Sequence, residues 1–236
     1  MNQIICVFNN VKGKNDRLKS LWGLAFLVKT QNIAILFDTG SNGDELYSNL
    51  EKLNINIREI QKIVISHNHR DHKGGLDRLL SENTKRIDLY YPESSETLDN
   101  NIYTKSKNVF FIRKTEKIND CVHIAGLFGY LIKEQCLVIN SDNGLILLIG
   151  CAHPGIVNMA RKIKKYFNRN IYAIFGGLHL EYCPSFIIKI ITAQLKNIGV
   201  IKIGPSHCTG EKAISLFKDV YKSDFIEMNL GDKFLF

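Results

Sequence analysis

The sequence lacks several features that would place it in a specialised class. No apolar stretch among the 236 residues reaches the roughly 18 that a membrane span needs. The N-terminus lacks the basic and then long apolar pattern of a secretory signal. No linker rich in proline, glycine or serine, no internal repeat and no low-complexity tract divides the chain. We therefore expect no membrane partner and one large folded domain over residues 1–236, with two small domains as the alternative.

The cysteines also lack a recognisable pattern, because none of them stands at the paired spacing of a thiolate metal site. This absence favours free thiols in a reduced, cytoplasmic setting. The six residues are Cys6, Cys121, Cys136, Cys151, Cys183 and Cys208.

Negative charge is in short supply, and the formal net charge is +8 at pH 7. Such an excess favours anionic partners, whether phosphate esters, diphosphates or nucleic acid, although a solvated basic face is the simpler explanation. We expect a small anionic substrate. The densest basic cluster, residues 161–165, shares a segment with Met159, Ile163 and Phe167, which recur at helical spacing. The cations then occupy the outer face of an amphipathic helix, so we do not expect nucleic acid as a partner.

Two alternating patterns predict the fold. Helical spacing predicts helices, and short apolar runs between turn residues predict buried strands. The polar residues 94–107 are expected to form a long loop or a poorly packed insert, and the pairs 24–29/33–37 and 136–139/145–149 are expected to form hairpins. The helices are expected at residues 44–53, 76–82, 156–167, 185–198 and 210–221. The strands are expected at residues 4–8, 24–29, 33–37, 63–66, 87–91, 109–112, 136–139, 145–149, 171–175, 200–203 and 225–228, with 234–236 beside the last.

Segment 66–73, which reads Ser-His-Asn-His-Arg-Asp-His-Lys, is the most informative part of the chain. It places His67, His69, Asp71 and His72 within six positions, directly after an apolar run. In an extended segment His67 and His69 point the same way, and a turn would present Asp71 and His72 to a second ion. Imidazole and carboxylate without thiolate suit zinc, manganese or iron, so we expect a binuclear centre of the hydrolytic type.

Three further histidines follow predicted strands and stand beside glycine, proline or serine. They are His153 in Gly-Cys-Ala-His-Pro-Gly, His179 in Gly-Gly-Leu-His, and His207 in Pro-Ser-His-Cys-Thr-Gly. Strand ends hold ligands rigidly while short loops leave them accessible. The alternative for each is a histidine that satisfies a buried carbonyl group.

These motifs resemble those of the metallo-β-lactamase superfamily. Segment 66–75 is similar to its His-x-His-x-Asp-His motif, and Leu-Phe-Asp-Thr-Gly at 36–40 is similar to its first motif. The later histidine motifs resemble the branch that contains the dihydropterin–ribofuranosylaminobenzene phosphate synthase. The resemblance implies an α/β fold, a four-layer αββα sandwich in which two mixed sheets lie face to face with helices outside.

The resemblance also implies a ligand set. His67 and His69 would bind one metal ion together with His153, while Asp71 and His72 would bind another together with His207. Most members of the superfamily have a bridging aspartate after a mid-chain strand, but Cys151 stands near that point here. The bridging ligand is therefore left open between Cys151, His179 and none.

Other residues near the motifs have more than one interpretation. His179 is a ligand, a general acid that touches substrate, or a support for a ligand, and Asp71 both binds metal and orients water. Asp38 is placed to hydrogen-bond a ligating imidazole, or to shape its own loop. His123 matches no motif and is expected to be structural.

Taken together, the sequence predicts a metal-dependent hydrolase that uses metal-activated hydroxide on a small, phosphorylated substrate. Two divalent ions, zinc before manganese or iron, are the expected cofactors. One alternative is a synthase-like transferase that displaces diphosphate. The other is a non-catalytic metal-binding or sensor protein.

Overall fold

The computed structural model describes residues 2–83, 85–93 and 98–236. The chain forms two compact units. Unit 1 runs to Arg113 and also contains Asn229–Phe236, whereas unit 2 is Lys114–Met228. The single domain expected over residues 1–236 stays a prediction.

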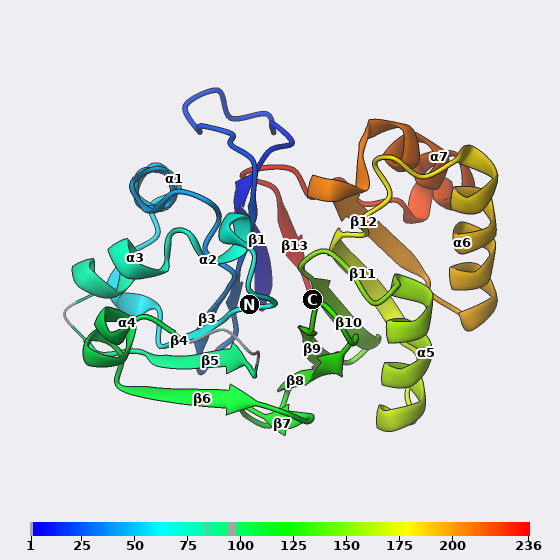
Figure 1. The fold of residues 1–236 in the computed structure, drawn as a ribbon. Coiled ribbons are helices and arrows are strands. Elements are labelled where there is room, and N and C mark those ends of the chain that lie inside the picture. The colour runs from blue at the N-terminus through cyan, green and yellow to red at the C-terminus, as the bar shows by residue number, and fades with distance from the viewer. Residues whose placement is uncertain (1, 84, 94–97) are drawn as a thin grey trace. The chain divides into compact units, whose positions relative to one another are not determined.

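Unit 1 contains a mixed sheet of seven described strands in the order β13-β1-β2-β3-β4-β5-β6 (Figure 1). Strands β13, β1, β2 and β3 pair antiparallel, and β3 to β6 pair parallel. The strand bounds are β1 Gln3–Asn9, β2 Leu24–Lys29, β3 Ala34–Phe37, β4 Lys62–Val64, β5 Asp88–Pro92, β6 Asn108–Ile112 and β13 Lys233–Leu235.

Helices cover one face of this sheet with apolar side chains. Leu46 and Leu50 of α1 and Leu79 of α3 are buried in the same cluster as Leu27 and Leu36 of the sheet. The side chain of Asn42 caps α1 by accepting the backbone N–H of Glu45 at 3.1 Å, which fixes where the helix begins. The helices of unit 1 are α1 Gly43–Lys52, α2 Arg70–Lys73, α3 Leu76–Glu82, α4 Asn100–Lys105 and the 3₁₀ turn η1 Ile57–Glu59.

Unit 2 repeats this plan with six described strands in the order β12-β11-β10-β9-β8-β7. Strands β7 to β10 pair antiparallel, and β10, β11 and β12 pair parallel. The strand bounds are β7 Glu116–Lys117, β8 Val122–Phe128, β9 Glu134–Ser141, β10 Gly144–Ile149, β11 Ile171–Gly177 and β12 Lys202–Ser206.

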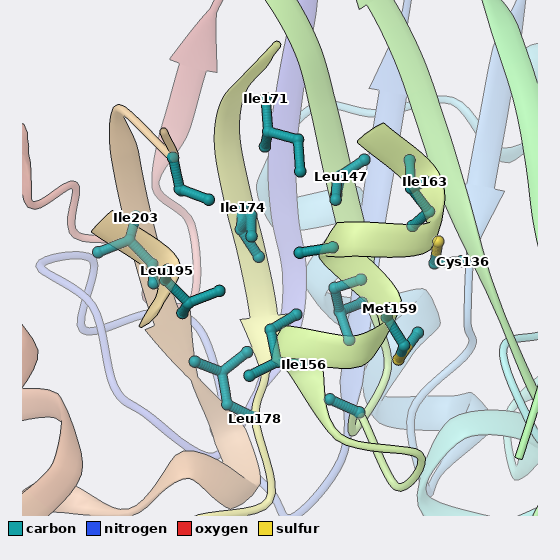
Figure 2. Packing of buried hydrophobic residues seen from close by; sticks show 14 of the residues in the cluster. Cys136, Leu147, Ile156, Met159, Ile163, Ile171, Ile174, Leu178, Leu195 and Ile203 are labelled. Carbon is teal, nitrogen blue, oxygen red and sulfur yellow. The ribbon is translucent and has the colours of Figure 1, made fainter. Parts of the chain in front are cut away.

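The core of unit 2 lies between this sheet and its helices. Ile156, Met159 and Ile163 point from α5 toward Leu147 and Ile174 of the strands (Figure 2). Helices α5 and α6 end at Asn168 and Gly199, both in the left-handed conformation that stops a helix. The helices are α5 Ile156–Phe167, α6 Ser185–Ile198 and α7 Glu211–Tyr221, with 3₁₀ turns η2 His207–Thr209 and η3 Lys222–Asp224.

The parallel strands fix where functional side chains gather, because the carboxyl ends of parallel strands meet at one edge of a sheet. In unit 1, Asp38 follows β3 and segment 66–72 follows β4. In unit 2, His153 follows β10, His179 follows β11, and His207 follows β12. Among the described residues, none of the helices is both long and apolar enough to cross a bilayer.

Most predicted elements are confirmed. Helices at 76–82, 156–167 and 185–198 and the strand at 24–29 have the predicted bounds. Both predicted hairpins pair antiparallel. The two mixed sheets with helices confirm the predicted α/β fold class.

Three expectations are wrong. Residues 225–228 form no strand, because Phe225 makes only an isolated bridge with Ile203 at the sheet edge. Residues 234–236 were expected beside that segment, but β13 pairs with β1. The loop expected at 94–107 contains α4, whose Ile102 is buried; residues 94–97 of this segment lie outside the described residues.

Gly176 makes the parallel pairing of β10 and β11 possible. Its φ is +120°, and a β-carbon there would lie 1.9 Å from the carbonyl oxygen of Ile149. Gly155 also has positive φ, at +87°, but a β-carbon there would meet nothing within 4 Å. A substitution at Gly155 therefore tests backbone strain alone, whereas one at Gly176 tests backbone strain together with steric overlap.

We predict that Gly155→Ala lowers the free energy of unfolding by about 1–3 kcal/mol, the cost of holding a residue with a β-carbon in a sparsely populated backbone conformation at positive φ. Gly176→Ala adds overpacking to that strain and should lower it by roughly 3 kcal/mol or more. Urea denaturation followed by circular dichroism measures both. Equal losses in the two variants would contradict the steric account of Gly176.

Candidate metal centre

A buried carboxylate organises the histidine segment of unit 1. Asp38 is fully buried, and its Oδ1 accepts the backbone N–H of Ser66 at 2.6 Å. Its Oδ2 accepts the Ser66 hydroxyl at 2.8 Å and faces Nδ1 of His72 at 2.7 Å. The loop after β3 is tied on further, since the backbone N–H and hydroxyl of Thr39 donate to the carbonyl of His72 at 2.7 and 3.1 Å.

These bonds also set which nitrogens of the two rings carry a proton. Because the Ser66 hydroxyl donates to Asp38, its oxygen accepts from Nδ1 of His67, 2.9 Å away. His72 likewise donates from Nδ1 to Asp38. Both rings therefore present the lone pair of Nε2 away from Asp38, which is the arrangement that a metal ligand needs.

The remaining nitrogens of these rings lie in two donor pairs. Nε2 of His67 is 3.1 Å from Nδ1 of His69. Nε2 of His72 is 3.7 Å from a carboxylate oxygen of Asp71, whose side chain is 20% exposed. His67 and His72 are buried, while His69 is exposed. The turn expected at Asp71 and His72 is the short helix α2, which begins directly after His69.

In unit 2, three histidine loops are joined by backbone hydrogen bonds. The N–H of Gly177 donates to the carbonyl of Gly150 at 3.2 Å. The N–H of Leu180 donates to the carbonyl of Cys208 at 3.1 Å, and that of Leu178 to the Thr209 hydroxyl at 3.0 Å. As a result the rings of His153 and His179 lie close, with centroids 4.5 Å apart.

Two buried thiols lie among these histidines. The sulfur atoms of Cys151 and Cys208 are 3.2 Å apart, and neither forms a disulfide. The hydrogen bond between the two thiols lowers the pKa of Cys208, and the hydrogen bond with Cys208 raises the pKa of His179. Cys151, His207 and Cys208 each offer a donor atom within 4.8 Å of the others, and so do Cys151, His153 and His179.

Glu134 does for unit 2 what Asp38 does for unit 1. It is fully buried at the start of β9, and its carboxylate accepts three consecutive backbone N–H groups. Those of Cys151, Ala152 and His153 donate to it, each at 2.9 Å. Three charge-assisted hydrogen bonds fix the loop that carries His153.

Strained backbone conformations gather at the same loops. Seven described residues other than glycine have positive φ, and Asp38, Ala152, His179 and His207 are four of them. Each such residue costs about 1–3 kcal/mol, so it persists only where surrounding bonds enforce it. Strain of this kind is typical of functional sites.

The donor set of unit 1 fits a divalent metal ion. Two imidazole nitrogens at about 2.0–2.1 Å from a tetrahedral zinc lie about 3.3 Å apart, close to the 3.1 Å between His67 and His69. The proton positions argued above put the lone pair of His67 on Nε2, the atom that belongs to this pair.

The structure adds two residues that the sequence did not point to, Glu134 and Cys208. Glu134 precedes an apolar strand and has the sequence context of an exposed strand end. Cys208 had one clue, its position directly after His207. His123 lies apart on β8, where its ring packs edge-on against Phe167 at 5.2 Å, and burial lowers its pKa.

Two mixed sheets with imidazoles at the carboxyl ends of their parallel strands define a metallo-β-lactamase-fold protein. The chain is similar to the solved structure of Tm1679, described as a metal-dependent hydrolase of the beta-lactamase superfamily. The TM-score is 0.86 and the identity 25%, over 100% of this chain and 99% of the other. It also shares its fold with the metallo-beta-lactamase fold protein YhfI from Bacillus subtilis, with a TM-score of 0.69 and 11% identity over 99% and 98% of the chains.

One relative from Methanocaldococcus jannaschii is 31% identical over 97% of this chain and 95% of its own length. It is the 7,8-dihydropterin-6-methyl-4-(β-D-ribofuranosyl)-aminobenzene-5'-phosphate synthase. The family described as "Anti-Pycsar protein Apyc1" matches residues 17–106. The chain therefore belongs to the metallo-β-lactamase superfamily, in the family of that dihydropterin–ribofuranosylaminobenzene phosphate synthase.

We predict that Asp38→Asn weakens metal binding by roughly 10- to 100-fold, the scale seen when a hydrogen-bond partner of a ligand is lost. An amide has one accepting oxygen and one donating NH₂ group. It therefore cannot accept all the hydrogen bonds that Ser66 and His72 donate to the two oxygens of Asp38. Competition with a chromogenic chelator measures the affinity. Asp88→Asn is the matched control, since Asp88 pairs with Lys62 at 3.0 Å at the other end of the parallel strands; an equal loss there would contradict a specific role for Asp38.

We predict that Glu134→Gln lowers the free energy of unfolding by about 1–3 kcal/mol, because the amide NH₂ faces a buried N–H that has lost its acceptor. Thermal and urea denaturation of the metal-free protein measure this loss. The exposed Glu181→Gln serves as control and should change stability by less than about 0.5 kcal/mol. A Glu134→Gln variant as stable as the parent would show that the three bonds contribute little.

Proposed function

We propose that this protein is a metal-dependent hydrolase that acts on a small, phosphorylated substrate. The observation that supports it most directly is the donor pair of His67 and His69, 3.1 Å apart, with the proton of His67 held on Nδ1 by the Ser66–Asp38 chain. An imidazole pair prepared in this way has little value to a protein that binds no metal.

The proposed ligand set has two parts. His67 and His69 bind one divalent ion with His153, and Asp71 and His72 bind a second with His207. Zinc is the preferred ion because imidazole and carboxylate donors dominate, and manganese or iron would also suit them. Cys151 is a further candidate ligand, since its sulfur lies near donor atoms of both His153 and His207.

Divalent ions at such a centre would lower the pKa of water toward neutrality and polarise a phosphoryl oxygen. The chain itself has to orient the water and move protons. We assign to Asp71, which is partly exposed in the first turn of α2, the role of accepting a proton from the attacking water. His179 is exposed and the hydrogen bond with Cys208 raises its pKa, and we assign to its ring the role of donating a proton to the leaving group.

A second candidate is transfer with loss of diphosphate, as in a synthase. It is favoured by the 31% identity to the M. jannaschii synthase over nearly the whole of both chains. The proposed metal ligands would then serve to hold the diphosphate group of the substrate, while an aromatic carbon of the acceptor displaces that group and bonds to the carbon that carried it.

The expected partner is a small anion, in keeping with the net charge of +8. We propose neither nucleic acid nor a membrane as a partner. A reducing, cytoplasmic setting agrees with six free cysteines.

Metal analysis tests the site. Purified protein should contain about two equivalents of zinc, manganese or iron, and His67→Ala with His69→Ala should remove at least one, measured by plasma mass spectrometry. Cys151→Ser, as a comparison, should keep its metal if the thiol is only packed and lose one equivalent if it is a ligand. Metal content unchanged in the double histidine variant would refute the assignment.

An activity panel tests the reaction. Metal-loaded protein is assayed with bis(p-nitrophenyl) phosphate and with a pterin methyl diphosphate, in the presence and absence of an arylamine acceptor. Hydrolysis without acceptor supports the leading proposal, and diphosphate release that needs the acceptor supports the second. Two bound metals with no turnover of any substrate would favour a binding or sensor protein.

A further inference from the structure

Three large hydrophobic side chains in the described residues are almost fully exposed. Tyr130 and Tyr182 are 92% exposed and Leu131 is 93% exposed, whereas no other exposed large hydrophobic among the described residues exceeds 66%. All three belong to unit 2 and lie on two loops. Both loops stand at the edge of the unit 2 sheet that carries the histidines.

Tyr130 and Leu131 form the tip of the turn between β8 and β9. Phe128 pairs with Glu134 below this turn, and Glu134 is the residue that binds the backbone of the His153 loop. A β-carbon at Gly129 would lie 3.1 Å from Pro154, the neighbour of His153. Because β9 runs antiparallel to β10, its first residue meets the carboxyl end of β10, so the turn stands at the histidine edge of the sheet.

Tyr182 lies three residues beyond His179, in the loop after β11. This loop is held at the same edge, since the N–H of Glu181 donates to the carbonyl of Cys208 at 3.3 Å and that of Cys183 to the carbonyl of Leu180 at 3.0 Å. Strands β9 and β11 are the two neighbours of β10. The two hydrophobic loops therefore flank the His153 loop on either side, about 10 Å apart at their roots.

Side chains this exposed do not stabilise the fold, because they bury almost no area. On the rim of a site they become useful when a ligand covers them. Tyrosine offers a flat apolar face at small entropic cost, and such faces stack on planar rings. Two such loops on either side of histidines suit a ligand that joins a planar ring to an anionic group.

We propose that Tyr130, Leu131 and Tyr182 are specificity-determining residues that contact a planar, fused-ring part of the substrate. This inference rests on the proposed function, because it assigns the ring to the same substrate whose phosphate reacts at the histidines. The hydrophobic rim, defined as these three residues, recognises the ring, and the metal ligands recognise the anion. A second copy of the chain or another protein could also cover the hydrophobic rim. Neither would need a rim that stands beside the histidines, whereas a substrate would.

The test measures binding and turnover separately. Titration of the metal-loaded full chain with 6-methylpterin, a fluorescent fused-ring probe, gives ring affinity without any reaction. Tyr182→Ala and the double variant Tyr130→Ala with Leu131→Ala should each weaken this binding about fivefold or more, on the scale of one aromatic stacking contact. Tyr182→Phe should keep the affinity, since its ring face is retained.

Two controls separate the rim from the rest of the protein. Tyr166→Ala removes a 66% exposed tyrosine near the end of α5, at the opposite edge of the sheet, and should leave probe binding unchanged. All the variants should keep the metal content of the parent chain and its affinity for inorganic pyrophosphate. A loss in pyrophosphate affinity equal to the loss in probe affinity would overturn the assignment of the rim to the ring.

The failures of the two proposals look different. Absent metal or absent turnover in the parent chain counts against the proposed function. A parent chain that holds metal and turns over phosphodiesters, but binds 6-methylpterin no better than the alanine variants do, overturns the rim alone. A parent dimer that the rim variants dissociate, measured by light scattering, would assign the rim to self-association and overturn it as well.

Discussion

The arrangement of this protein depends on one constraint: histidines placed just beyond the ends of parallel strands need loops that cannot move. Each unit meets it with one fully buried carboxylate that accepts backbone N–H groups from the histidine loop. Asp38 holds Ser66 and His72 in unit 1, and Glu134 holds Cys151, Ala152 and His153 in unit 2. A buried charge without such partners would be strongly destabilising, so the carboxylates and the loops stabilise one another.

The same two carboxylates have an electrostatic effect. Asp38 places a negative charge behind the imidazoles of His67 and His72, which present the lone pairs of Nε2 away from it, and Glu134 places one beneath the backbone of the His153 loop. The charge of Asp38 makes these two imidazoles better donors, and both charges favour a cation at the strand ends. The left-handed backbone at Asp38 and Ala152 belongs to this arrangement, since it lets the chain turn sharply enough for the carboxylate and the N–H groups to meet.

Much of the fold could be predicted from the sequence, because central strands such as β2 and β10 are buried along nearly their whole length and so are continuously apolar. The prediction failed where pairing rather than local pattern decides. Residues 225–228 are apolar enough for a strand but form only one isolated bridge. Strand β12 continues through Gly204 and Pro205 because its parallel pairing with β11 continues there, and an edge strand tolerates proline.

The candidate site shows the same division. His67, His69, Asp71 and His72 could be found because all four stand in one short segment. The partners of Glu134 are 17 to 19 residues away, and Cys151 and Cys208 are 57 residues apart, so no local pattern could join them. Contacts of that range are visible only once the strands have been ordered.

The left-handed backbone at His179 and His207, with φ of 53° and 55°, has a practical consequence for mutagenesis. Alanine enters this region of conformational space reluctantly, while asparagine enters it readily. Replacing either histidine by alanine thus deletes an imidazole and distorts its loop in one step. Asparagine removes the imidazole without straining the main chain. It is therefore the better substitution for measuring what each ring contributes to metal binding and activity.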